Sequence, residues 1–117
     1  MEHESINYVE FPAQDLSTTK QFFNQVFNWS FEDYGDEYTA FEAKGLTGGF
    51  YLSDKASSTE SGAALIVIYS QDLEATQSKI EQAGGVVHVP IFAFPGGRRF
   101  HFKEPSGNEL AVWSDRE

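Results

Sequence analysis

The sequence predicts an α+β fold made of two βαβββ modules in one chain, with module 1 at about residues 1–53 and module 2 at about 62–117. The first observation is an internal repeat, since VEFPAQDL and IVIYSQDL both end in Gln-Asp-Leu, at Asp15 and Asp72. The second is that a strand-like run precedes each repeat and a helix-like run follows it. The third is that three short strand-like runs, separated by turn residues, follow each helix-like run.

In module 1, residues 6–11 are expected to form the first strand. Asp15 or Ser17 can cap the following helix by accepting backbone N–H bonds. Asn28 is expected to end that helix. An apolar stripe with helical spacing lies between, at Phe22, Phe23, Val26 and Phe27. The remaining strands are expected at 29–33, 38–43 and 48–52, separated by YGDE and KGLT.

In module 2, residues 63–69 are expected to form the first strand, and Asp72 is the candidate helix cap. Gly84-Gly85 predicts the end of the helix, because glycine adopts the left-handed conformation found there. One helical face carries Leu73, Thr76, Ile80 and Ala83. Strands are expected at 86–92, 98–103 and 109–113, separated by FPGG and EPSGN. The Ser-rich stretch SDKASSTESG, residues 53–62, is expected to be a mobile connector.

The composition narrows the classes of function. The net charge of −10 argues against nucleic-acid binding, which depends on Lys and Arg neutralising phosphates. The absence of Cys excludes disulfides, thiolate metal sites and a Cys nucleophile. No apolar run approaches the roughly 20 residues of a membrane span, and MEHESINY lacks the pattern of a signal peptide. The expected location is therefore the cytoplasm, with no nucleic-acid or membrane partner.

The doubled pattern, with DLSTTKQFFNQVFNW after the first strand and FKEPSGNELAVW at the end, resembles the vicinal oxygen chelate superfamily. This group includes glyoxalase I, the bleomycin-resistance proteins and the extradiol dioxygenases. The resemblance covers essentially the whole chain. It implies that the curved mixed sheets of the two modules surround a shared cavity. It also implies pairing of two chains through their sheets, so a homodimer is expected.

In metal-using members, four ligands come from the first and last strands of each module, and these are typically His and Glu. Carried over by position, the ligand positions fall on Tyr8, Leu65, Gly49 or Tyr51, and Ala111. None of these is a usual ligand, and Leu65 and Ala111 have no side-chain atom that coordinates a metal. The resemblance therefore implies a member without the usual metal site, and no cofactor is expected.

Strand alternation predicts that Glu109, Ala111 and Trp113 face the cavity, and that the core holds Phe100, Phe102, Leu110 and Val112. The predicted aromatic walls are Tyr8, Tyr51, Tyr69 and Trp113, and the predicted polar groups are Glu10, His101 and Arg99. An apolar hollow with a few convergent polar groups is typical of small-molecule sites. Glu10 and His101 are the candidate catalytic residues, and Tyr8, Tyr51, Tyr69, Arg99 and Trp113 are the candidate ligand-binding residues.

Each candidate also has a structural interpretation. Glu10 can be a general base whose pKa is raised by apolar surroundings, or a carboxylate paired with Arg99. His101 can be a base, an ordinary strand histidine, or one half of a two-ligand metal site with Glu10. The tyrosines and tryptophans can be plain core. PGGRR, residues 95–99, lacks the ending of a phosphate loop and is better explained as a hairpin turn, whose Arg98 or Arg99 could hold a ligand carboxylate.

Three functions remain open, because a fold alone does not select one. The first is a metal-free protein of the bleomycin-resistance type that binds a small aromatic or apolar molecule. The second is a glyoxalase-like lyase, isomerase or dioxygenase with a displaced metal site or with Glu10 as general base. The third is a dimeric accessory module, for which residues 92–94 offer an aromatic edge.

Overall fold

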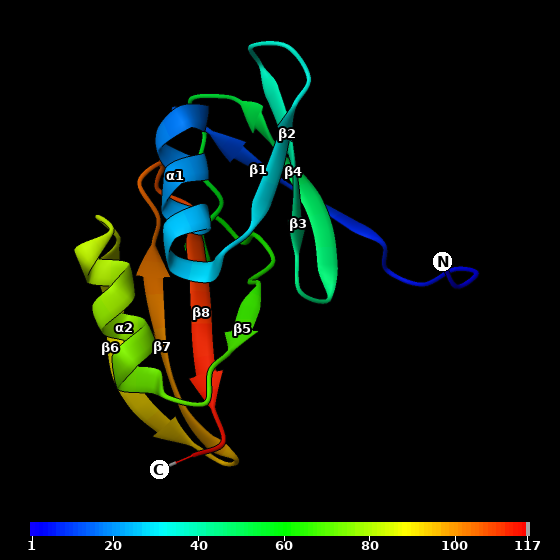
Figure 1. The fold of residues 1–117 in the computed structure, drawn as a ribbon. Coiled ribbons are helices and arrows are strands. Elements are labelled where there is room, and N and C mark those ends of the chain that lie inside the picture. The colour runs from blue at the N-terminus through cyan, green and yellow to red at the C-terminus, as the bar shows by residue number, and fades with distance from the viewer. Residues whose placement is uncertain (117) are drawn as a thin grey trace.

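The computed structural model describes residues 1–116 and contains two four-stranded sheets and two helices (Figure 1). Module 1 comprises β1 (Tyr8–Ala13), α1 (Leu16–Phe27), β2 (Ser30–Asp33), β3 (Tyr38–Ala43) and β4 (Leu46–Leu52). Module 2 comprises β5 (Val67–Tyr69), α2 (Leu73–Gln82), β6 (Val86–Phe94), β7 (Gly97–Lys103) and β8 (Glu109–Ser114). The predicted α+β fold with two βαβββ modules is confirmed.

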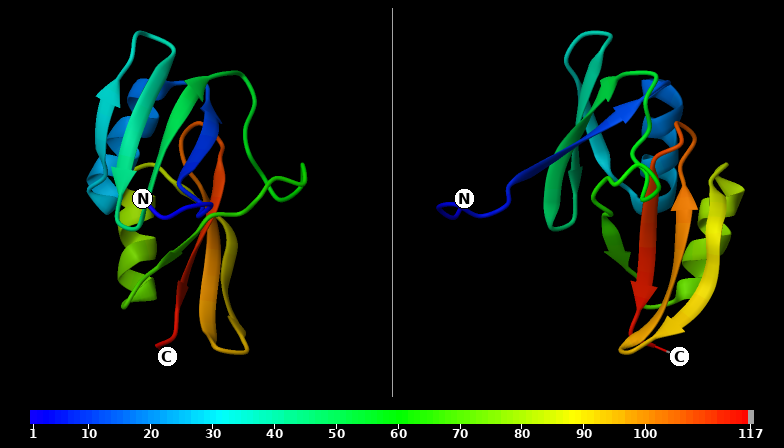
Figure 2. Two further views of the ribbon diagram at one scale, coloured as in Figure 1. Left: turned by 90° about the vertical axis from the view of Figure 1, so that its right-hand side faces the viewer. Right: turned by 180° about the vertical axis from the view of Figure 1, so that it is seen from behind.

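The two sheets have the same topology, as the sequence repeat predicts. Sheet A has the strand order β1-β4-β3-β2, and sheet B has the order β5-β8-β7-β6. In each sheet the first strand runs parallel to the last strand of its module, and the other neighbours are antiparallel. Figure 2 shows the linker between β4 and β5 joining the two sheets. No helix within residues 1–116 is long and apolar enough to cross a bilayer.

Both helices begin and end where the sequence predicts. The carboxylates of Asp15 and Asp72 accept backbone N–H bonds from Thr18 and Ala75, each at 3.1 Å, so each aspartate caps its helix. Asn28 ends α1 in the left-handed conformation, with φ 60°. Gly84, with φ 97°, follows the end of α2.

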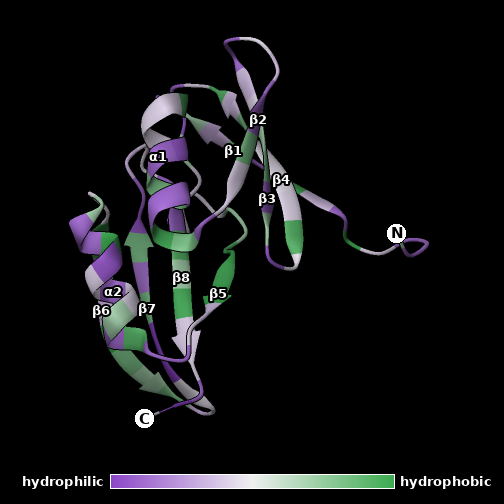
Figure 3. Ribbon diagram, viewed as in Figure 1, coloured by the Kyte–Doolittle hydropathy of each residue, from purple (hydrophilic) through white to green (hydrophobic). Residues whose placement is uncertain are grey.

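The core lies between the helices and one face of each sheet. Figure 3 shows hydrophobic residues along β5 and part of β8, whereas β7 and both helices mix hydrophilic and hydrophobic residues. The Phe23 ring of α1 stacks on Trp29 and on Phe50 of β4, with ring centres 4.4 and 5.5 Å apart. The ring centres of Phe22 in α1 and Phe102 in β7 lie 5.9 Å apart, so α1 also packs against the second module. The helix-facing residues of sheet B, as predicted, are buried at Phe100, Phe102, Leu110 and Val112.

A buried carboxylate joins the two modules. Glu104 is 2% exposed and lies in the turn between β7 and β8. Its Oε1 accepts bonds from the Thr19 hydroxyl of α1 at 2.7 Å and the Ser106 N–H at 2.9 Å. Its Oε2 accepts bonds from the backbone N–H and side-chain amide of Asn108, at 3.2 and 2.7 Å. That amide also donates to the Pro12 carbonyl at 2.6 Å, so the EPSGN turn holds β1 and α1 against sheet B.

The linker differs from its prediction, and so does the strand that follows it. The predicted mobile connector is tied to module 2, because Glu109 N–H donates to the Ser57 carbonyl and Ser57 N–H donates to Asn108 Oδ1, both at 2.8 Å. The linker thereby occupies the edge of β8 where a longer β5 would pair. As a result β5 begins at Val67 rather than at residue 63. The strand β1 also begins later than expected, at Tyr8 rather than at residue 6.

Candidate functional site

Each sheet has one face that no helix covers. We call the face of sheet A opposite α1 face A, and it carries Tyr8, Glu10, Tyr38 and Tyr51. We call the face of sheet B opposite α2 face B, and it carries Tyr69, Arg99, His101, Glu109 and Trp113. Strand alternation fixes both sets, because the residues between them pack into the core.

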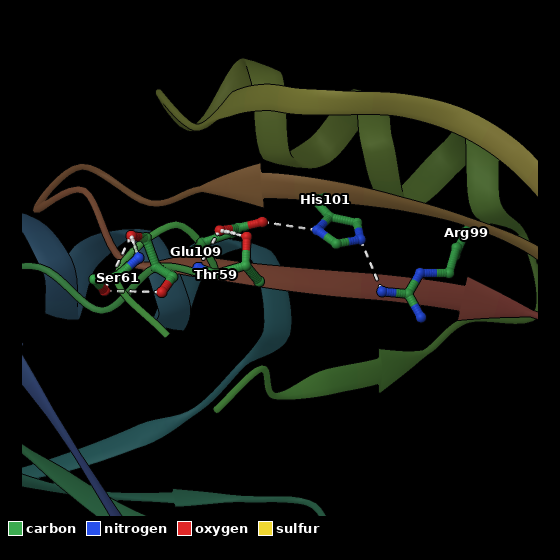
Figure 4. Close-up of polar contacts among 6 residues, drawn as sticks. Thr59, Ser61, Arg99, His101 and Glu109 are labelled. Carbon is green, nitrogen blue, oxygen red and sulfur yellow. Dashed lines mark hydrogen bonds and ion pairs between the residues drawn. The ribbon is translucent and has the colours of Figure 1, made fainter. Parts of the chain in front are cut away.

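Three polar side chains form a line across face B (Figure 4). The Nδ1 atom of His101, from β7, lies 2.7 Å from Oε2 of Glu109, from β8. The Nε2 atom of the same ring lies 2.8 Å from Nη2 of Arg99, two residues earlier on β7. His101 is therefore held between a carboxylate and a guanidinium.

Glu109 remains ionised although it is 2% exposed. Burial raises its pKa, but the Thr59 backbone N–H bond, the His101 contact and the Thr59 hydroxyl outweigh burial and lower the pKa to about 2. The Thr59 N–H and hydroxyl donate to Oε1 at 2.8 and 2.9 Å. The linker thus supplies the groups that stabilise the charge of Glu109.

These contacts determine the tautomer of His101. An ionised carboxylate only accepts hydrogen bonds, so Nδ1 carries a proton and donates it to Glu109. A guanidinium only donates, so Nε2 is unprotonated and accepts from Arg99. The ring is neutral in this arrangement, and its basic nitrogen is occupied by Arg99.

Arg99 makes no ion pair with a carboxylate within residues 1–116. Its guanidinium carbon lies 5.6 Å from the centre of the Phe92 ring, a cation–π arrangement. Its Nε is buried and has no hydrogen-bond partner in the described part of the chain. The neighbouring Arg98 points to the opposite face, where it binds Glu74 of α2 at 2.6 and 3.1 Å. Of these two arginines, Arg99 is the one placed to meet an anionic ligand.

Aromatic rings lie on the same face beyond the polar line. Tyr69 and Trp113 make an edge-to-face contact with ring centres 5.3 Å apart. The ring centres of Phe94 and Trp113 lie 6.3 Å apart, and those of Phe92 and His101 lie 6.2 Å apart. Face B therefore combines the Arg99 guanidinium with several aromatic surfaces.

Face A carries a second polar cluster. The Tyr38 hydroxyl donates to Glu10 Oε2 at 2.8 Å and lies 2.6 Å from the Tyr8 hydroxyl. Burial and the bonds to Tyr8 and Glu10 raise the pKa of Tyr38. The Tyr38 ring lies over Gly49, where a Cβ would overlap its hydroxyl. The absence of a side chain at Gly49 is what admits the cluster.

The structure thus divides the predicted site residues between two faces. Tyr8, Glu10 and Tyr51 lie on sheet A, and Tyr69, Arg99, His101 and Trp113 lie on sheet B. No hydrogen bond or ion pair joins Glu10 to His101 or to Arg99 in the described part of the chain. The interpretation of Glu10 as a partner of Arg99 is wrong, because Tyr38 takes that place.

Three of the positions carried over for the usual metal ligands can be located on the two sheets. Gly49 lies beneath Tyr38, Tyr8 bonds to Tyr38, and Ala111 is buried between Glu109 and Trp113 on β8. Across residues 1–116, no cluster of three or more His, Asp or Glu side chains could hold a metal ion.

Sequence reasoning missed three contacts of the site. These are the contacts of Glu109 with His101, of Thr59 with Glu109, and of Tyr38 with Glu10. Alternation along β8 did place Glu109 on the side of His101. The register of the β7–β8 hairpin pairs His101 with Ala111 and Lys103 with Glu109, so the contact is diagonal. Thr59 reaches Glu109 from the linker, and no short-range pattern predicts such a contact.

Comparison with known proteins agrees with this architecture. The model of the Glyoxalase/Bleomycin resistance protein/Dioxygenase superfamily matches residues 5–112. No curated protein matches the chain in sequence.

Solved structures with the same fold share little sequence with this chain. A glyoxalase-related enzyme from Fulvimarina pelagi has a TM-score of 0.78 and 15% identity, covering 96% of this chain and 88% of that one. The fosfomycin resistance protein FosX from Listeria monocytogenes has a TM-score of 0.79 and 16% identity, covering 97% and 94%. A lactoylglutathione lyase from Agrobacterium tumefaciens has a TM-score of 0.72 and 16% identity, covering 97% and 95%. These likenesses show the fold, and the family match extends over most of the chain. The chain therefore belongs to the Glyoxalase/Bleomycin resistance protein/Dioxygenase superfamily.

Proposed function

We propose that this protein binds a small aromatic molecule that carries an anionic group, on face B and without a metal. The observation that carries the proposal is Arg99, a cation that lies over Phe92 and has no carboxylate partner among residues 1–116. A guanidinium binds a carboxylate or phosphonate through two parallel N–H bonds. The ligand's anionic group would therefore sit at Arg99.

The aromatic residues of face B suit the rest of such a ligand. Trp113 and Tyr69 offer ring surfaces on the same face as Arg99, and Phe92 flanks the guanidinium. Aromatic walls with one or two placed polar groups are the usual composition of small-molecule sites. The ligand class is accordingly a planar acid, such as an aromatic carboxylate.

A second copy of the chain is the proposed cover for this site. Face A presents Glu10, Glu32 and Glu42 as exposed acids. Face B presents Arg99 and Lys103. Opposite charges on two uncovered sheet faces favour a homodimer in which face A of one chain lies against face B of the other.

A second candidate function, an enzymatic one, rests on the contact between His101 and Glu109. A carboxylate that holds Nδ1–H directs the lone pair of Nε2 outward, which is the arrangement of a general base. In this structure Arg99 occupies Nε2, so proton abstraction would require Arg99 to move toward a bound anion. Glu10, bonded to Tyr38 on face A, remains the alternative base.

Calorimetric titration of metal-stripped protein with aromatic acids tests the proposal. We expect 2-naphthoate to bind and 2-naphthylmethanol, which lacks the charge, to bind at least tenfold more weakly. Arg99→Gln should reduce naphthoate affinity by about tenfold, equivalent to about 1.4 kcal/mol. Arg98→Gln is the matched control and should bind as wild type, because Arg98 pairs with Glu74 on the other face. Equal losses in both variants would show that Arg99 is not the anchor.

A further inference from the structure

A cavity of about 670 Å³ lies where the two modules meet, and its lining includes one face B residue, Tyr69. Sheet A contributes the core-facing side chains of Val9, Phe41 and Leu46, and β5 with the residue before it contributes Ile66 and Ile68. The C-terminal end of α1, followed by Trp29, closes another side. This volume lies within the range of roughly 300–1,000 Å³ found for drug-sized ligands.

The lining of this cavity is apolar and incompletely covered. Val9, Phe27, Leu46, Ile66 and Ile68 are each half-buried, although they flank the main core. Removing such accessible apolar surface from water when a ligand binds is favourable, because of the hydrophobic effect. The cavity is therefore suited to a molecule with a substantial apolar part.

The charges around the cavity select the sign of the ligand. The chain has 18 acidic residues and a net charge of −10, yet none of the described residues lining this cavity is acidic. Lys44 and Lys79 both line it. Nζ of Lys79 donates one hydrogen bond to the Val26 carbonyl at 3.2 Å, at the C-terminal end of α1. This contact offsets the partial negative charge of the helix end and leaves the ammonium two further donors.

From this arrangement we propose a second ligand site, in which the cavity between the modules binds an amphipathic carboxylic acid. The apolar chain lies among Trp29, Ile66 and Ile68, and the carboxylate meets Lys79 and Lys44 at the opening. The site shares Tyr69 with face B but neither Arg99 nor His101, so it does not depend on the anion anchor proposed for that face.

The two tryptophans allow this site to be observed separately. Trp29 lines the cavity, whereas Trp113 lies on face B. In the Trp113→Phe variant, Trp29 is the single remaining tryptophan, and its fluorescence reports on the cavity. The probes are decanoate, decanol and decyltrimethylammonium below their micelle-forming concentrations.

We expect saturable binding of decanoate with a change in Trp29 emission, and binding at least fivefold weaker for the other two probes. Lys79→Gln should weaken decanoate binding by about fivefold and leave decanol unchanged. Lys55→Gln, which alters an exposed lysine outside this cavity, is the matched control and should have no effect. Ala43→Phe should block the cavity, because Ala43 lines it from β3. Ile66→Phe, which fills the cavity from the other side and adds no tryptophan, serves if the first blocked variant fails to fold.

Three results would overturn the proposal. The first is no saturable change in Trp29 emission with decanoate. The second is equal binding of all three probes, which would remove the selection for an anion. The third is decanoate binding that survives Ala43→Phe and Ile66→Phe but is lost in Arg99→Gln, which would place the acid on face B. Conversely, binding lost in the blocked variants and retained in Arg99→Gln supports the cavity whatever face B does.

Discussion

His101 Nδ1 lies 2.7 Å from Oε2 of Glu109, and this contact determines which ring nitrogen of His101 carries the proton. It predicts that His101 populates the Nδ1–H tautomer, with Nε2 unprotonated beside Arg99. ¹⁵N NMR of imidazole nitrogens at neutral pH distinguishes the two tautomers. His3 and His88 are exposed and serve as internal references. Finding His101 as the Nε2–H tautomer would contradict the arrangement described for Arg99.

Ionised Glu109 is expected to stabilise the fold at neutral pH. Its folded-state pKa of about 2 lies below its usual value of 4.5, so its contribution is present above pH 4.5 and is lost as pH falls toward 2. Relative to wild type, Glu109→Gln should lower the free energy of unfolding by about 2 kcal/mol at pH 7. The difference should shrink on acidification, as urea unfolding from pH 7 to pH 3 can measure. A difference that is independent of pH would mean that the charge of Glu109 contributes nothing.

Glu104 should show the opposite dependence on pH. Burial raises its pKa above the usual 4.5, although the bonds from Ser106, Thr19 and Asn108 oppose this. The stability of wild type relative to Glu104→Gln is therefore greatest at low pH and falls as pH rises through the folded-state pKa. The same urea series measures this trend. A relative stability that rises with pH would contradict the raised pKa.

Removal of the Glu104 carboxylate should loosen the junction between the modules. Glu104→Ala leaves the donors of Thr19, Ser106 and Asn108 buried without their acceptor, so we expect a loss of about 3 kcal/mol or more in the free energy of unfolding. Glu81→Ala, at an exposed position on α2, is the control and should change stability by less than about 0.5 kcal/mol. Equal effects would show that the network does not support the fold.

On face A, the hydrogen bonds of the Tyr38 hydroxyl are expected to stabilise the fold. Tyr38→Phe removes the bonds to Glu10 and Tyr8 and should lower the free energy of unfolding by about 1 kcal/mol. Thermal denaturation measures this change. Tyr34→Phe is the comparison, because Tyr34 is exposed and its hydroxyl bonds only to exposed Glu32 among the described residues. Gly49→Ala should be more harmful than Tyr38→Phe, since the new Cβ would overlap the Tyr38 ring. A neutral Gly49→Ala would contradict the close packing over that glycine.

The repeated order of elements was predictable because its signals are local. Asp15 and Asp72 cap helices through bonds to residues three positions later, and Asn28 ends a helix through its own backbone conformation. Alternation along β7 and β8 likewise placed Phe100 and Leu110 in the core. Short-range periodicity carries this information directly.

The partners within the site were not predictable in the same way. The contact of His101 with Glu109 depends on a diagonal register, and Thr59 reaches Glu109 from a linker that composition alone marks as mobile. The pairing of Glu10 with Tyr38 depends on Gly49, whose missing side chain leaves room for the ring. Such contacts join distant parts of the chain, so sequence pattern identified candidate residues without identifying their partners.

Native mass spectrometry tests most directly the claim that face B binds an aromatic acid without a metal. The protein would be expressed in medium supplemented with nickel, zinc, iron and manganese, and then titrated with 2-naphthoate. We predict the metal-free mass of the chain, followed by one naphthoate per chain that is lost in Arg99→Gln and retained in Arg98→Gln. One metal ion per chain, with naphthoate bound only to the metal-loaded species, would contradict the account.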